Sequence, residues 1–401
     1  MTEMAQSTAT TATPKRILLM AEQYYPAIGG LARSGQRIAE TLAGLGHQVD
    51  VFTLSSQLDA GQANSEIISE RLTVHRFGRA RQIDFTLQQA TIFIEWLHQR
   101  GGNRNPIDLI WSHYAMQLGY LGIWLAKHWG VRSVLAVRGN DVDRQFLPPG
   151  DLSRLDWSLR NATQVVAVSQ DLAHKIRTIA DVDAHVLPNS VDLELFCPGP
   201  VSAELKRAYG IGAEHLVLIF SGELRAKKGL PMLIECYRQL SDLRPTKLLI
   251  IGEVRPKELG RFQQETLGLP NAERDIVCTG HLSELSDVLA HLRLGDIFVL
   301  PSLWDGLPNS LLEAMATEIP VIVSDAGAMP EIIENGQNGI LVPRHQLHRM
   351  AERIDHFFSK PAVERNQMIR AARQTVERNF SPTLEASRLA ALIEQGTPPL
   401  I

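Results

Sequence analysis

The fold class is decided by residues 301–320, Pro-Ser-Leu-Trp-Asp-Gly-Leu-Pro-Asn-Ser-Leu-Leu-Glu-Ala-Met-Ala-Thr-Glu-Ile-Pro. An apolar run at 296–300 leads into this stretch, and a second apolar run at 321–323 follows it. Between these two predicted strands lie a loop marked by glycine and proline and a short helix that starts near Pro308. Parallel sheets bind ligands outside the carboxyl ends of their strands, where helix N-termini point. The stretch therefore predicts a strand–loop–helix–strand unit with a binding site at the helix start.

Two carboxylates frame the start of this predicted helix. Asp305 lies in the loop, and Glu313 lies one turn into the helix. Because helical side chains tilt toward the N-terminus, Glu313 can reach back over the free amides of residues 307–310. Amides suit an anion and carboxylates suit hydroxyl groups, and a sugar nucleotide has both a diphosphate and hydroxyls. For an isolated glutamate, the alternative is a simple interaction with the positive end of the helix.

The complete string resembles the donor signature of the GT-B-fold retaining glycosyltransferases of family 4, the glycogen-synthase-like group. The family pattern is Pro-Ser, two variable residues, Glu-Gly, a second Glu eight positions after the first, then Ala-Met-Ala and Pro-Val-Ile. This chain has all of these elements except that Asp305 replaces the first Glu. The resemblance extends over residues 15–380. It implies an α/β protein of the GT-B fold, with two Rossmann-like doubly wound domains that face a central cleft.

Size and composition are those of an ordinary globular protein. The chain has 401 residues, of which 44% are hydrophobic and 21% charged, and 401 residues favour two domains. Its net charge of −4 gives no reason to expect a nucleic acid as partner. The three cysteines are far apart and odd in number, which is typical of reduced thiols and not of a disulfide framework.

The start of the chain lacks the basic and apolar regions of a signal peptide, and no run is long enough to span a bilayer. We therefore expect a cytoplasmic location, and a peripheral contact with the inner face of the membrane stays open.

Strand and helix patterns alternate along the chain, which predicts a mostly parallel sheet in each domain. After the strand at 165–168, Ser169 is expected to cap a helix that starts at Gln170. Residues 65–74 have the composition of a strand. Residues 85–98 have a helical pattern, with Ile92, Phe93 and Trp96 as the expected apolar face. The expected organisation is a flexible tail (1–13), an acceptor-side Rossmann-like domain (14–195), a linker (196–212), a nucleotide-sugar-binding Rossmann-like domain (213–379) and a C-terminal helix that crosses back toward the N-terminal domain (380–401).

The first domain offers candidate residues after three of its predicted strands. Gly29 and Gly30 follow the first strand, where glycine lets backbone amides approach a phosphate; a plain turn is the alternative. The resemblance places His113 at the donor sugar, as a catalytic residue, although a histidine after a strand is more often structural. We expect Tyr114, Arg138 and Asp141 on the acceptor side, and Arg138 could instead simply pair with Asp141.

Cations follow the first strand of the second domain. The family pattern there is Gly-Arg-Leu, three residues, then Lys-Gly, with the arginine and the lysine on the donor phosphates. Lys228 matches the lysine, but Glu223 occupies the arginine position. We infer that Arg225, two residues on, replaces the missing arginine; a solvated basic turn is the alternative. The full set of expected donor-binding residues is Gly29, Gly30, Arg225, Lys228, Gly252, His281, Asp305, Leu307, Asn309, Ser310 and Glu313, with Asp305 also catalytic.

The sequence thus predicts a retaining glycosyltransferase that transfers a hexose or hexosamine from a nucleoside diphosphate sugar, a UDP-sugar more readily than GDP-mannose. The acceptor would be a glycan, a lipid-linked or a small hydroxyl compound. No cofactor and no metal are expected. Of the two Asp-x-Asp strings, the one at 141–143 belongs to the expected acceptor-side loop and the one at 181–183 precedes a predicted strand, so we interpret both as incidental. The alternatives are a catalytically inactive sugar-nucleotide binding protein and a nucleotide-sugar 2-epimerase.

Overall fold

The computed structural model describes residues 13–100, 106–143 and 149–394. The expected N-terminal tail, except for residue 13, and the last residues of the expected C-terminal segment lie outside this range. The described chain clusters into two compact units. The first contains the chain up to Ala136, Pro148–Val165 and the chain from Ala386 onward, and the second contains Val137–Leu147 and Val166–Glu385. The units are thus interleaved in sequence, and the expected linker boundaries stay a prediction.

The first sheet has the strand order β3-β4-β2-β1-β5-β6-β7-β8 in the described residues. Strands β4, β2, β1, β5 and β6 follow one another in parallel, and β3 pairs antiparallel with β4 at the edge. This confirms the mostly parallel sheet. The strands are β1 (Arg16–Ala21), β2 (Gln48–Ser55), β3 (Ala63–Ser69), β4 (Leu72–Gly78), β5 (Leu109–His113), β6 (Arg132–Val137), β7 (Gln164–Ala167) and β8 (His185–Val186).

The strand expected at 65–74 is divided in the structure into β3 and β4, which a tight turn joins. Every residue of β3 is exposed. The sequence of β3 therefore lacks the alternation of buried and exposed residues that marks a half-buried strand. For this reason the turn between β3 and β4 could not be recognised from the sequence.

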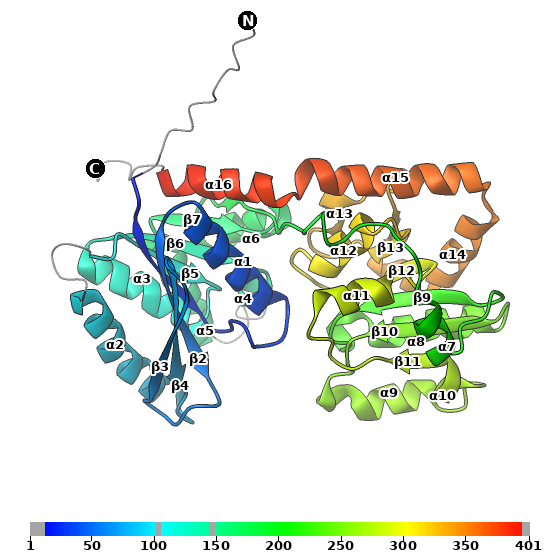
Figure 1. Cartoon of the computed structure of the whole chain (residues 1–401), viewed down its shortest axis with the longest axis horizontal. Coiled ribbons are helices and arrows are strands. Elements are labelled where there is room, and N and C mark those ends of the chain that lie inside the picture. Colours follow the sequence, from blue (N-terminus) through cyan, green and yellow to red (C-terminus); the bar gives the residue numbers. More distant parts are fainter. Residues whose placement is uncertain (1–12, 101–105, 144–148, 395–401) are drawn as a thin grey trace, which may run out of the picture. The chain divides into compact units, whose positions relative to one another are not determined.

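Helices follow the strands of this sheet in sequence, as expected for a doubly wound fold (Figure 1). Leu18, Phe52 and Ile110 from the sheet pack with Ile94 and Leu118 from the helices in one fully buried core. These helices are α1 (Gly30–Gly44), α2 (Ile83–Arg100), α3 (Gln117–Trp129), α4 (Asn140–Asp143), α5 (Pro149–Asn161), α6 (Gln170–Ala180) and α16 (Pro382–Glu394). The carbonyl of Ile393 in α16 accepts hydrogen bonds from Lys15 Nζ (2.6 Å) and Arg132 Nη1 (2.9 Å).

Of the apolar face expected for α2, Phe93 packs against the core, but the prediction is wrong for Ile92 and Trp96. The buried residues of this helix are Thr86, Ala90, Ile94 and Leu97. Ile92 is 73% exposed and Trp96 is 48% exposed. Both candidate faces of α2 carry apolar residues, so periodicity alone could not tell the packed face from the outer one. In the described part of the chain, no helix has the length and apolar character needed to span a bilayer.

The second sheet has the order β11-β10-β9-β12-β13-β14, and all of its pairs are parallel. Phe220, Phe298 and Leu300 are fully buried in it. The strands are β9 (Leu216–Ser221), β10 (Thr246–Ile251), β11 (Ile276–Cys278), β12 (Ile297–Leu300), β13 (Val321–Ser324) and β14 (Ile340–Val342). The helical segments are α7 (Ala203–Ala208), η2 (Ala226–Lys228), α8 (Leu230–Ser241), η3 (Pro256–Glu258), α9 (Leu259–Thr266), α10 (Ala272–Asp275), α11 (Leu285–Leu292), α12 (Asn309–Ala316), α13 (Met329–Ile332), η4 (Arg344–Arg349), α14 (Met350–Ser359) and α15 (Ala362–Asn379).

The unit predicted at 301–320 is confirmed. Strand β12 leads into the loop, α12 begins at Asn309 with Pro308 as its N-cap, and β13 follows. The loop after β12 therefore opens at the carboxyl edge of the second sheet, where β9 and β10 also end.

Candidate active site

The loops that follow β9 and β10 are joined backbone to backbone. Leu224 and Val254 form a parallel bridge, and the amide of Arg255 donates to the carbonyl of Leu224 (2.9 Å). Gly252 has φ 138°, and a Cβ on it would lie 2.4 Å from the carbonyl oxygen of Gly222. Only glycine permits this approach. Gly252 thus holds the two loops together, at one of the positions expected for donor binding.

The loop after β9 also contacts the loop after β12. The amide of Leu303 donates to the carbonyl of Lys227 (2.8 Å). Gly229 has φ 78°, and a Cβ there would lie 2.0 Å from the carbonyl oxygen of Pro301. The cations predicted from sequence are therefore fixed beside the stretch that contains Asp305.

Asp305 forms an ion pair with Lys228, and both side chains are 14% exposed. Its other carboxylate oxygen accepts the amide of Gly306 (3.0 Å). Burial alone would raise the pKa of Asp305, but Lys228 and Lys227 outweigh burial and hold the pKa below its usual value. The carboxylate of Asp305 is thus ionised. An anion that binds beside it would interact with the same lysine, Lys228.

Lys227 is a third cation at this position, which the sequence did not single out. Its Nζ donates to Asn140 Oδ1 (2.8 Å). Burial lowers the pKa of Lys227 to about 8, helped by repulsion from Lys228 and Arg225 and opposed by Asp305. Because the pKa of Lys227 is about 8 and two other cations lie nearby, an anionic ligand would stabilise the charged form of this lysine.

Glu223, at the position of the family arginine, bonds two arginines. Its carboxylate lies 3.3 Å from Arg225 Nη1 and 3.0 Å from Arg255 Nε. Arg255 follows β10 and was not predicted from sequence, because only the pairing of the two loops brings it to Glu223. The charge of Glu223 is therefore compensated within the loop, and the proposed substitution by Arg225 stays a prediction.

Three of the remaining residues predicted for donor binding, Asn309, Ser310 and Glu313, lie on α12. Glu313 is 6% exposed. Asn309 Oδ1 is buried and has no hydrogen-bond partner in the described residues. Leu307 is buried and its carbonyl accepts Asn189 Nδ2 (2.8 Å), while Ser310 is partly exposed. His281, expected as a further donor residue, is exposed on the loop after β11.

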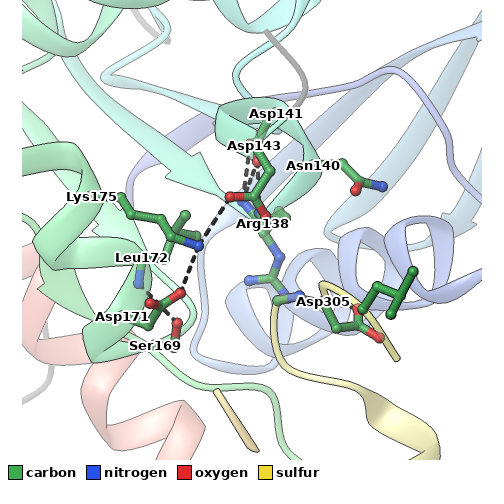
Figure 2. A network of polar contacts seen from close by, with 12 residues as sticks. Arg138, Asn140, Asp141, Asp143, Ser169, Asp171, Leu172, Lys175 and Asp305 are labelled. Carbon is green, nitrogen blue, oxygen red and sulfur yellow. Dashed lines mark hydrogen bonds and ion pairs between the residues drawn. The ribbon is translucent and has the colours of Figure 1, made fainter. Parts of the chain in front are cut away.

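Arg138 and Asp141 belong to a polar network in the same unit (Figure 2). Asp141 is fully buried and accepts the amides of Arg138 (2.9 Å) and Gly139 (2.7 Å). The Arg138 guanidinium donates to Asn189. Asp141 thereby shapes the loop after β6, and the acceptor roles of Arg138 and Asp141 stay predictions.

The same network continues to α6. Lys175 lies between Asp143 (3.0 Å) and Asp171 (2.9 Å) in Figure 2. Ser169 Oγ accepts the amide of Leu172 (3.2 Å), which confirms it as the N-cap of α6. Asp143, from the first Asp-x-Asp string, is thus an ion-pair partner.

In the first unit, His113 ends β5 and is 1% exposed. Its Nε2 lies 2.9 Å from Ser34 Oγ on α1. Tyr114 follows with φ 91°, an uncommon backbone conformation for a bulky residue. Gly29 is the N-cap of α1 with φ 124°, and Gly30 begins the helix. A strained residue directly after a strand marks this strand end as a candidate site.

The second unit therefore provides what an anionic, hydroxyl-bearing ligand requires: cations, buried carboxylates and a helix start at one sheet edge. Its described residues contain no group of three or more His, Cys, Asp or Glu side chains that could hold a metal ion. The second unit is thus a doubly wound α/β domain with a candidate anion-binding site at the carboxyl edge of its sheet.

Two family models match the chain. "Glycosyltransferase Family 4" matches residues 28–195, and "Glycosyl transferases group 1" matches residues 201–375. Together they cover most of the sequence. The chain therefore belongs to the GT-B-fold glycosyltransferases of family 4, enzymes that transfer a sugar from a nucleotide-sugar donor to an acceptor.

Among curated proteins, the chain is 23% identical to the N-acetyl-alpha-D-glucosaminyl L-malate synthase of Bacillus anthracis over 361 residues, 89% of this chain and 91% of the relative. It is 26% identical to the D-inositol 3-phosphate glycosyltransferase of Pseudarthrobacter chlorophenolicus over 391 residues, 90% of each chain.

Solved structures with the same fold include the sucrose-phosphate synthase of Thermosynechococcus elongatus, with a TM-score of 0.81 and 20% identity over 95% of this chain and 98% of that one. Anabaena HepE in complex with UDP-glucose has a TM-score of 0.77 and 16% identity over 94% of this chain and 99% of that one. These similarities confirm the GT-B fold.

Proposed function

We propose that this glycosyltransferase transfers a hexose or hexosamine, with retention of the anomeric configuration, from a nucleoside diphosphate sugar to a hydroxyl acceptor. The observation that carries the proposal is the buried carboxylate of Asp305, which is paired with Lys228 and lies near Lys227, with Arg225 in the same cationic loop. Three cations held at the end of a parallel sheet can neutralise a diphosphate leaving group. A solvated basic turn would not be paired to a buried carboxylate in this way.

In the proposed reaction the bond between the anomeric carbon and the diphosphate oxygen breaks, and a bond from the acceptor oxygen to that carbon forms on the same face. The acceptor proton passes to the released diphosphate. Lys227 and Lys228 stabilise the negative charge that develops on the leaving group. As the diphosphate takes over Lys228, the Asp305 carboxylate can accept a hydrogen bond from a donor-sugar hydroxyl, as can Glu313.

We propose a UDP-sugar as donor in preference to GDP-mannose, which the UDP-glucose complex of the structurally similar HepE supports. For the acceptor, the curated relatives support a hydroxyl compound, because their names include an L-malate and an inositol phosphate enzyme. Acceptors that are glycans or lipid-linked fit the same chemistry.

We also propose that neither a cofactor nor a metal ion takes part, because we expect the lysines and the N-terminus of α12 to neutralise the charge of the phosphates. Activity should then survive excess chelator. If activity is lost in chelator and restored by a divalent metal, the phosphate charge has been assigned to the wrong groups.

For location, we propose a cytoplasmic protein that contacts the membrane peripherally through the outer face of α2. Phe85 (49% exposed), Ile92 and Trp96 lie along one side of that helix. The guanidinium of Arg100 lies 5.0 Å from the Trp96 ring centroid, and Arg79 and Arg81 are exposed just before the helix. Apolar and aromatic side chains flanked by arginines match the interface of a bilayer with anionic headgroups.

Sedimentation with vesicles tests this surface. We expect binding to phosphatidylglycerol-containing vesicles, weaker binding to pure phosphatidylcholine, and loss of binding in Ile92→Ser/Trp96→Ser. Trp124→Ser, which changes an exposed tryptophan on α3, is the matched control. Equal binding by both variants, or a dimer that forms through α2 in place of vesicle binding, contradicts the membrane contact.

The proposed reaction is tested with a panel of nucleotide sugars, by saturation-transfer binding followed by product analysis. We expect preferential binding of UDP-sugars and a product linkage with the configuration of the donor. Tight donor binding without transfer or hydrolysis would support the inactive binding protein, and interconversion of two UDP-sugars would support the epimerase.

A further inference from the structure

A cavity of about 460 Å³ opens in the second unit, and none of the predicted donor-binding residues line it. It lies along the edge strand β14 and the turn before it, and helices α14 and α15 contribute to its wall. Its volume is in the range of sites for small organic ligands. Nothing in the proposed glycosyl transfer uses this cavity.

Three basic side chains line this cavity. Arg353 and His356 lie on α14, and Lys360 caps the end of the same helix. Because they are three and four residues apart in sequence, they fall on one side of the helix. No other described residue forms an ion pair or a side-chain hydrogen bond with Arg353 or Lys360.

The carboxylates that could neutralise these cations are bonded to other arginines. Glu352 forms a bidentate pair with Arg349 (2.7 and 2.8 Å). Asp355, the other acid of α14, pairs with Arg244. The cavity therefore has an excess of positive charge, although the chain as a whole is acidic.

Asp325 is the acid that lines the cavity itself. Its Oδ1 accepts both the amide (2.9 Å) and Nε (3.0 Å) of Arg344. Arg344 does not line the cavity, so its charge offsets that of Asp325 without using any of the three basic groups.

Asn335 and Gln346 are polar members of the wall, and the other part of the wall is apolar. Leu341 and Pro343 from the β14 edge face the cavity together with the nearly buried Phe357 and Met368. An apolar wall and a cationic rim fit a ligand that has an apolar or planar body and a compact anionic group. A phosphate monoester suits this rim, because its dianion accepts hydrogen bonds from several donors at once.

We propose that this cavity binds a small organic phosphate monoester, as a second ligand site separate from the donor site. The amide of Leu303 contacts Lys227, and the donor residues lie on loops that do not line the cavity. UDP should therefore not compete for it. This proposal does not depend on the proposed function, since it concerns different residues and a different ligand.

Titration calorimetry with phenyl phosphate tests the proposal. We expect saturable binding to the complete chain, weaker binding of inorganic phosphate and none of benzyl alcohol. Arg353→Gln/Lys360→Gln should weaken phenyl phosphate binding by at least about tenfold, since two charge-assisted hydrogen bonds are removed. Lys257→Gln/Arg370→Gln, which removes the same charge from exposed positions of the same unit, should bind like the parent.

A second variant separates this site from the donor site. Lys228→Gln should bind phenyl phosphate normally, and saturating UDP should leave the titration of the parent unchanged. The proposal is overturned if the parent does not bind, if Arg353→Gln/Lys360→Gln binds as tightly as the parent, or if UDP displaces phenyl phosphate.

Discussion

The strand ends of the two sheets carry different chemistry on the same kind of scaffold. In the first unit, β5 ends in His113, which is buried and bonded to the hydroxyl of Ser34. In the second unit, the loops after β9, β10 and β12 bring together Lys228, Lys227 and the ionised Asp305.

We expect this difference to divide the reaction between different loops. A diphosphate requires fixed cations, which the second unit has, whereas the neutral hydrogen-bonding groups at the end of β5 suit sugar hydroxyls. The first sheet is mostly parallel, the second is wholly parallel, and helices begin after strands in both, so we expect the chemistry to follow from the loops and not from the architecture. The predictions below test whether the division holds.

The largest effect is expected for Glu313→Gln. The change replaces a buried carboxylate that we expect to accept hydrogen bonds from donor hydroxyls, and each lost charge-assisted bond costs about 1.5–3 kcal/mol, or about 10- to 150-fold. The measurement is kcat/KM for the preferred UDP-sugar. Glu364→Gln, an exposed glutamate on α15, is the control. Near-normal turnover in Glu313→Gln would contradict the prediction that α12 binds the donor sugar.

Asp305→Asn should separate binding from transfer. Without its carboxylate partner, Lys228 is available to the diphosphate, so UDP should bind as tightly as to the parent or more tightly. Transfer should fall at least about tenfold, because a hydrogen bond from the donor sugar to a charged group is lost. Titration of UDP and initial rates decide this. Weaker UDP binding together with normal transfer contradicts the assignment.

Arg225→Ala should impair UDP binding about as much as Lys228→Ala does, if Arg225 replaces the family arginine. Glu223→Ala should be mild, because it frees Arg225 and Arg255 for the ligand. Arg225→Ala with Glu223→Arg should recover part of the loss, since the cation returns to the family position. If Arg225→Ala binds UDP like the parent while Glu223→Ala fails, Glu223 has a role of its own.

UDP affinity should depend on pH through Lys227. Its pKa of about 8 means that the charged form is present below pH 8 and is lost as the pH rises above that value. Affinity should then fall by up to about tenfold from pH 7 to pH 9. Lys227→Arg should remove this dependence, because arginine keeps its charge over the whole range. A parent profile that is flat between pH 7 and pH 9 contradicts the contact.

The smallest effect is expected in the first unit. Ser34→Ala removes one hydrogen bond of His113, which contributes about 0.5–1.5 kcal/mol. We expect kcat to fall a few-fold with UDP affinity unchanged. A large loss of UDP affinity in this variant would show that the two units do not divide the reaction as proposed.

Sequence reasoning predicted the parts of the fold that local pattern determines. These parts are the unit at 301–320, the N-cap at Ser169 and the mostly parallel sheets. They could be predicted because strand runs, helix caps and glycines can each be recognised from a few consecutive residues. The prediction that Ile92 and Trp96 lie on the packed face of α2 was wrong, because both side chains are as apolar as the residues that the core buries.

Within the site, the resemblance to the family signature predicted Lys228, Asp305 and Glu313. It could not show that Lys228 and Asp305, 77 residues apart, form an ion pair. Arg255 and the burial of Lys227 were missed for the same reason, because both depend on loops that meet only in the folded chain.

The central claim is that the lysines of the loop after β9 bind the diphosphate of the donor, and calorimetric titration of UDP into Lys227→Gln/Lys228→Gln tests it most directly. We predict binding at least about 30-fold weaker than in the parent, because two charge-assisted contacts are removed. The control Lys257→Gln/Arg370→Gln should bind UDP like the parent. If the double lysine variant binds UDP as tightly as the control does, the diphosphate lies elsewhere and the account is wrong.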